Sequence, residues 1–170
     1  MEFAYWGCAL LVIVAFITDV RTMKIPNKLT IPAMASGMLY QIINAGWEGF
    51  LFSGKGFLAG FGILLFMYWM GAVGAGDVKL FGGIGTWTGV LFTVQAMLYS
   101  ILYASLIGII ILLWRRETLS RIRNISKGIA GFFIMKDISI LKNSGKEPLR
   151  FPFMLAVVPG VISAYLYIVS

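Results

Sequence analysis

The sequence contains no histidine and a single cysteine, Cys8, among its 170 residues. Without histidine there is no catalytic triad built on imidazole and no pair of histidine haem ligands. One thiol cannot build a zinc cluster or a disulfide scaffold. Cys8 lies within an apolar run, where a small buried side chain is its expected role. Few side chains are therefore available for catalytic chemistry.

Charged residues are also scarce. They make up 12% of the chain, and hydrophobic residues make up 59%. A typical soluble domain is about 25% charged and about 45–50% apolar. Seven acidic residues cannot give a water-facing surface to a globular domain, and so much apolar surface excludes a disordered chain. The composition predicts an all-α polytopic membrane protein, organised as a single domain over residues 1–170.

The apolar residues fall into five runs, and one of these is unusually long. A membrane span needs about 20 apolar residues. The run over residues 78–114 is too long for one span and long enough for two, and the glycines and threonines of residues 85–89 predict a turn inside it. The sequence therefore predicts six transmembrane helices. The runs are residues 3–18, 29–45, 57–73, 78–114 and 151–169.

Basic residues predict the orientation of these spans. Arg21, Lys24 and Lys28 lie between the first two runs, and the loop at residues 115–150 contains nine basic and three acidic residues. Both loops are expected on the cytoplasmic side, so an even number of spans separates them. Six spans with both termini outside fit this rule. Isoleucines at helical spacing in the long loop predict an interfacial helix, held against membrane lipid, between spans five and six.

Only two acidic residues touch the hydrophobic segments, Asp19 after the first run and Asp77 just before the long run. Acids at such positions are costly and are by default candidates for function. The predicted topology places both at the cytoplasmic boundary. Two carboxyl groups within hydrogen-bonding reach share a proton, so one can activate water while the other protonates a leaving amine. A purely structural alternative is that Asp19 ends a span and Asp77 caps the next helix.

The residues around each acid resemble a known family. Gly74-Ala75-Gly76-Asp77 resembles the GxGD motif of intramembrane aspartyl proteases. Asp19, followed by Ile25-Pro26-Asn27, resembles the first loop of type IV prepilin and preflagellin peptidases, and residues 150–160 are similar to their last span. The resemblance implies an aspartyl endopeptidase with Asp19 and Asp77 as the catalytic pair. It also implies the substrates: pilin-like precursors (prepilin, Flp-type or preflagellin) with a short basic leader, cut at the cytoplasmic face of the cell membrane.

Each of the neighbouring residues has a second interpretation. Gly74 and Gly76 are candidates to accommodate an extended substrate strand, or they simply pack helices. Pro26 and Asn27 are candidates to shape the active-site loop, although Asn27 capping the second span is a simpler account. Lys79 either favours the charged form of Asp77 or extends to the lipid headgroups.

The resemblance is to a short form of the family. Long bacterial members carry a cytoplasmic region with paired CxxC motifs and an N-methyltransferase activity, and a chain with one cysteine is expected to lack both. No cofactor, metal or nucleic acid is expected; the partners are the precursor protein and membrane lipid. Two other functions stay open. A proton-coupled transporter or channel predicts acids near the bilayer midplane and an inverted repeat, and an inactive scaffold of a secretion assembly predicts no chemistry.

Overall fold

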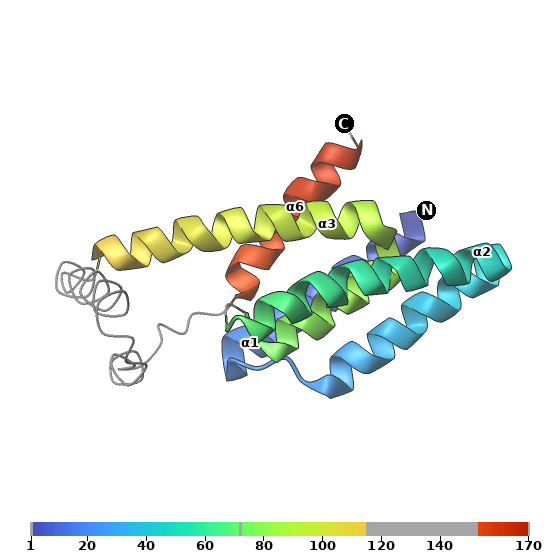
Figure 1. Cartoon of the computed structure of the whole chain (residues 1–170), viewed down its shortest axis with the longest axis horizontal. Coiled ribbons are helices and arrows are strands. Elements are labelled where there is room, and N and C mark those ends of the chain that lie inside the picture. Colours follow the sequence, from blue (N-terminus) through green and yellow to red (C-terminus); the bar gives the residue numbers. More distant parts are fainter. Residues whose placement is uncertain (1, 72, 115–152, 170) are drawn as a thin grey trace, which may run out of the picture. The chain divides into compact units, whose positions relative to one another are not determined.

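The computed structural model describes residues 2–71, 73–114 and 153–169. These residues form four helices and no strand, so the predicted all-α class is confirmed for the described part of the chain (Figure 1). The predicted interfacial helix within residues 115–150 lies outside the described residues. The helices are α1 (Glu2–Thr22), α2 (Asn27–Trp69), α3 (Ala75–Trp114) and α6 (Met154–Val169).

The described helices have the character of membrane spans. α1, α2 and α3 are long and apolar enough to cross a bilayer, and α6 is a shorter apolar helix. In lipid, a helix satisfies its own backbone groups where water is absent. Large apolar side chains such as Trp6, Ile43 and Leu91 remain 72%, 81% and 79% exposed. Such surfaces are rare on soluble proteins and suit contact with lipid. The chain is a multi-pass membrane protein.

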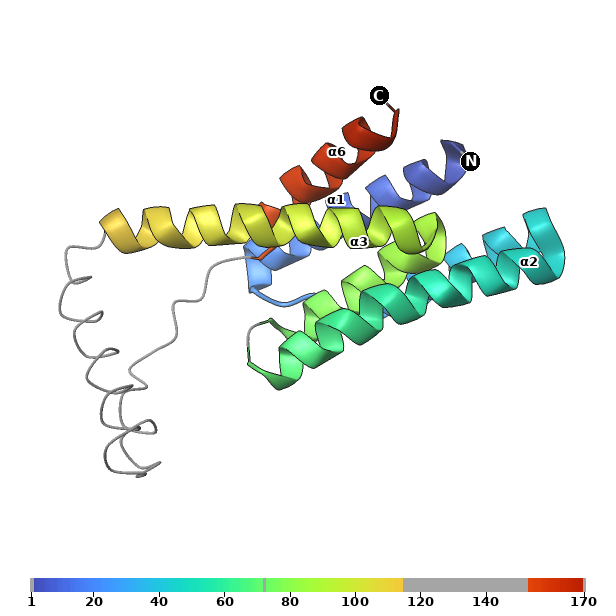
Figure 2. The ribbon, with the colours of Figure 1, turned by 45° about the horizontal axis from the view of Figure 1, so that its top comes forward.

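α2 contains one break in its helical backbone, at Gly46, whose φ of 55° lies in the left-handed region. A Cβ on Gly49 would collide with the carbonyl of Gln41, eight positions earlier. A straight helix would hold these residues about 12 Å apart. α2 therefore doubles back on itself, as Figures 1 and 2 both show.

α3 folds back in the same way at Gly89, whose φ is 76°. A Cβ on Gly60 would collide with the carbonyl of Phe81 and lie 2.9 Å from Cγ2 of Thr93. In a straight helix Phe81 and Thr93 would be about 18 Å apart, so one residue of α2 could not touch both. Gly89 is the last residue of the turn that the sequence predicts at 85–89.

The sequence leaves residues 46–56 between two apolar runs, and the structure shows this segment helical except for Gly46, because one glycine with positive φ is enough to reverse the chain. Three of the four described helices are long and apolar enough to qualify as spans, and the count of six spans stays a prediction.

The helices pack at unusually short range where glycines meet. A Cβ on Gly56 of α2 would collide with the carbonyl of Gly85 in α3, so the two backbones touch. Small residues allow this close approach between membrane helices. Polar contacts add to it, because the indole N–H of Trp87 donates to the Ala33 carbonyl at 3.0 Å. The hydrophobic core takes nearly fully buried side chains from all four helices, among them Cys8, Leu64, Phe81, Ile84 and Val157.

The chain divides into two compact units, Met1–Ala104 with Pro152–Ser170, and Ser105–Phe151. The packing described above belongs to the first unit. The described part of the second unit is the end of α3, which is helical. A single domain over residues 1–170 stays a prediction.

Candidate active site

Asp19 and Asp77, from α1 and α3, line one cavity of about 330 Å³. The two side chains are 7% and 9% exposed, so both acids are nearly buried. Of the other residues that the sequence singles out, Asn27, Gly74, Gly76 and Lys79 line the same cavity, and Pro26 is not among its lining residues. The structure therefore brings together two acids that are far apart in the sequence.

The start of α3 fixes the Asp77 carboxyl group. Gly74 precedes the first helical residue, and its N–H donates to Oδ2 of Asp77 at 3.1 Å. The N–H of Asp77 donates back to the Gly74 carbonyl at 3.1 Å. This exchange resembles a capping box, in which the third helical residue satisfies the N–H that precedes the helix. The sequence left open that Asp77 only caps a helix. Asp77 does cap α3, but as the third residue of the helix and not as the residue before it.

The end of α1 fixes the backbone at Asp19. Met23 adopts a left-handed conformation, with φ 54°, and its N–H donates to the Asp19 carbonyl at 2.8 Å. This is the αL motif that often ends a helix, in which one backbone hydrogen bond closes the last turn. The left-handed residue of this motif is usually glycine, whereas here it is methionine. One oxygen of the Asp19 side chain, Oδ2, accepts the backbone N–H of Met154 at 3.2 Å. That donor stands at the start of α6, and no motif in the sequence points to it.

The loop between α1 and α2 then passes directly over Gly76. A Cβ on Gly76 would lie 3.2 Å from Cβ of Ile25, which is tighter than an ordinary contact. Ile25 is 9% exposed and joins the core. The missing side chain at Gly76 therefore makes room for the protein's own loop, and a role of Gly76 toward substrate stays a prediction.

Lys79 and Asn27 join the starts of α3 and α2. The Lys79 ammonium donates to Oδ1 of Asn27 at 2.8 Å, which is neither of the two roles that the sequence suggests for Lys79. Asn27 as the cap of the second span is wrong: the N-cap is Pro26, in an extended conformation, and no side-chain bond caps the helix. The Asn27 side chain is used for the contact between helices instead.

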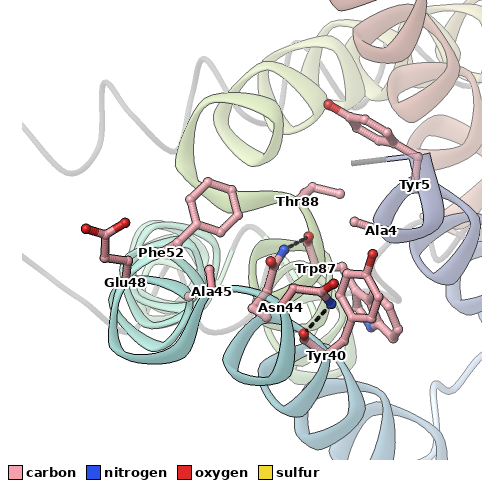
Figure 3. A pocket seen from close by; sticks show the side chains of 11 residues that line it. Ala4, Tyr5, Tyr40, Asn44, Ala45, Glu48, Phe52, Trp87 and Thr88 are labelled. Atoms are coloured by element: carbon pink, nitrogen blue, oxygen red, sulfur yellow. Dashed lines mark hydrogen bonds between the residues drawn. The ribbon is translucent and has the colours of Figure 1, made fainter.

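A larger cavity, of about 390 Å³, contains no comparable pair of acids. Glu48 is the carboxylate among its lining residues, and Figure 3 shows it pointing away from the other labelled side chains. The amides of Gln41 and Asn44 donate to the backbone carbonyls of Trp87 and Tyr40. These amide donors are therefore already used, and the smaller cavity is the better candidate for hydrolytic chemistry.

The fold and the site together define a multi-pass membrane protein in which two nearly buried carboxyl groups from separate helices share one cavity. The chain belongs to the type IV leader peptidase family, whose family model matches residues 6–113. The matched segment contains both acids, the first loop and the start of α3.

Curated relatives support the same family. The chain is 32% identical over 162 residues to a prepilin leader peptidase/N-methyltransferase of Bacillus subtilis (strain 168), covering 94% of this chain and 53% of that protein. Proteins of the same name from Pectobacterium carotovorum subsp. carotovorum and Aeromonas hydrophila are 29% and 31% identical, over 66% and 65% of this chain and 42% and 40% of theirs. The chain thus spans about half the length of these relatives, or less. No solved structure matches it.

Proposed function

We propose that this chain is a membrane aspartyl endopeptidase that removes the short basic leader from pilin-like precursors. The observation that carries the proposal is the shared cavity of Asp19 and Asp77, inside the segment matched by the type IV leader peptidase family. The curated relatives are named prepilin leader peptidases, which supports the same substrate class.

The chemistry follows from two carboxyl groups that share one proton. The ionised group takes a proton from water, whose oxygen attacks the scissile carbonyl carbon. The protonated group then donates to the leaving nitrogen, the C–N bond breaks, and the products are a carboxylic acid and a free amine. Burial suits this division, because two adjacent carboxylates in a poorly hydrated cavity do not both ionise readily. The geometry does not assign which acid plays which part.

We also propose six crossings, with the acids near the cytoplasmic surface and residues 2 and 169 near the outer one. At about 1.5 Å per residue, 43 and 40 residues would give helices of about 65 and 60 Å, twice the thickness of a bilayer core of about 30 Å. The reversals at Gly46 and Gly89 support two crossings for each helix. With α1 and α6 this makes six, and the basic residues favour the stated orientation.

Reporter fusions test the topology. Fusions after Met23 and Asn124 are expected to report the cytoplasm, and fusions at Trp47 and Ser170 the outside. An outside signal at Asn124 would contradict the six crossings and the common depth of the acids.

The test of the function is cleavage of a designed precursor by the full chain in liposomes. The precursor carries a short Lys- and Arg-rich leader ending in glycine, followed by about 20 apolar residues. Asp19→Asn and Asp77→Asn are each expected to abolish leader removal. Glu48→Gln is the matched control, because it makes the same change at an exposed carboxylate away from the site. Activity retained in either inserted aspartate variant would overturn the proposal.

A further inference from the structure

The start of α6 lies directly against Asp19. Phe153 precedes the helix, and its carbonyl accepts the N–H groups of Ala156 and Val157 at 2.9 and 3.2 Å. The first N–H groups of a helix have no acceptor within the helix. The N–H of Met154, the first residue of α6, donates instead to Oδ2 of Asp19, 135 positions away in the chain.

This hydrogen bond is well placed to control the carboxyl group. Asp19 is 7% exposed and Met154 is fully buried, so little water is available to replace the donor. A helix N-terminus also favours a negatively charged neighbour. A bond to Oδ2 restricts rotation about the Cβ–Cγ bond of Asp19 and thereby fixes the direction of Oδ1. Asp77 is held in the same manner, through its own Oδ2, by the N–H of Gly74.

We propose that the backbone N–H of Met154 is a positioning group for Asp19, so that α6 orients one of the two acids without supplying a catalytic side chain. The inference rests on the proposed function, because it concerns the geometry of the Asp19–Asp77 pair. The proposal gives α6 a role in the site, although α6 lies outside residues 6–113, the segment that the family model matches.

The experiment removes this N–H and leaves the helix intact. Met154→Pro is suited to it, because proline is tolerated at the first helical position and the preceding residue lies outside the helix. Met154→Ala is the matched control: it also loses the buried side chain but keeps the N–H. In liposomes with the designed precursor, Met154→Pro is expected to lower kcat about 10- to 100-fold relative to Met154→Ala, with KM unchanged. Met154→Leu, which keeps both the bulk and the donor, is expected to restore kcat to near the unmodified value.

Two outcomes separate this inference from the proposed function. Equal kcat in Met154→Pro and Met154→Ala, with Asp19→Asn inactive, would overturn the positioning role and leave the proposed function standing. Activity in Asp19→Asn would overturn the proposed function itself. If Met154→Pro does not insert, the α-hydroxy analogue of methionine at position 154 replaces the N–H by oxygen and keeps the side chain. Unchanged kcat in that protein would equally overturn the inference.

Discussion

Gly74 controls how closely the Asp77 carboxyl group approaches the start of α3. A Cβ at this position would lie 3.1 Å from Oδ2 of Asp77, closer than an ordinary contact of 3.4–4 Å. In Gly74→Ala the carboxyl group must move by a few tenths of an ångström, away from the N–H that now binds it at 3.1 Å. The methyl group and the donor belong to the same residue, so relieving the contact is expected to lengthen or bend the hydrogen bond.

The expected magnitude follows from the strength of that bond. A hydrogen bond to a charged acceptor contributes about 1.5–3 kcal/mol, and losing about half of it corresponds to a rate about 3- to 10-fold lower. Because glycine is preferred over alanine at an N-cap, the free energy of unfolding is also expected to fall, by about 0.5–2 kcal/mol, which leaves most of the protein folded. We therefore expect kcat to fall while the protein still inserts and folds.

The assay is the initial rate of leader removal in liposomes, with insertion measured for each variant. Gly62→Ala is the matched control, since nothing lies within 4 Å of a Cβ at that helical position. It is expected to keep the normal rate and to stabilise α2 by up to about 1 kcal/mol. If Gly74→Ala cleaves as fast as Gly62→Ala, the hydrogen bond between Gly74 and Asp77 does not hold a reacting group and the reasoning is wrong.

Three further predictions follow from other contacts. Gly56→Val brings a side chain onto the Gly85 carbonyl, so its thermal unfolding temperature in detergent should fall sharply, whereas Gly54→Val, in open space, should cost less than about 1 kcal/mol. Lys79→Met and Asn27→Ala each remove the same 2.8 Å hydrogen bond, so their effects on cleavage should be non-additive; fully additive effects would show that the contact does not couple the helices. A chelator such as EDTA should leave the rate unchanged, because no three metal-binding side chains gather among the described residues; a rate restored only by added metal would contradict this.

The sequence predicts which residues line the cavity better than it predicts their contacts. Asp19 and Asp77 stand out because acids are rare in apolar segments, and both line the cavity. The role expected for Asn27 is wrong because capping preference is local, whereas the partner of Asn27 is Lys79, 52 positions later. A glycine at position 76 indicates that some group packs closely there. The sequence does not show that this group is Ile25, because that depends on the path of the loop.

The contact between Met154 and Asp19 has no side-chain pattern that could reveal it. The donor is a backbone N–H, which every residue except proline carries, and its importance depends on where α6 packs. The reversals inside α2 and α3 pose a similar problem. The sequence predicts the turn at residues 85–89 and a break after residue 45, but not that φ at one glycine, Gly89 or Gly46, makes each reversal inside a helix.

The hydrogen bond between Asp19 and Met154 also sets an order of events during protein synthesis. Asp19 leaves the ribosome 135 residues before its donor, which at about 5–20 residues per second is a delay of roughly 7–27 s. Asp77 and its donor Gly74 are made within that interval, so a growing chain contains both acids before Asp19 has its donor. Under the proposed function, a newly inserted chain acquires its oriented pair only once α6 has docked, and until then its cleavage of neighbouring helices would be slowed as in Met154→Pro.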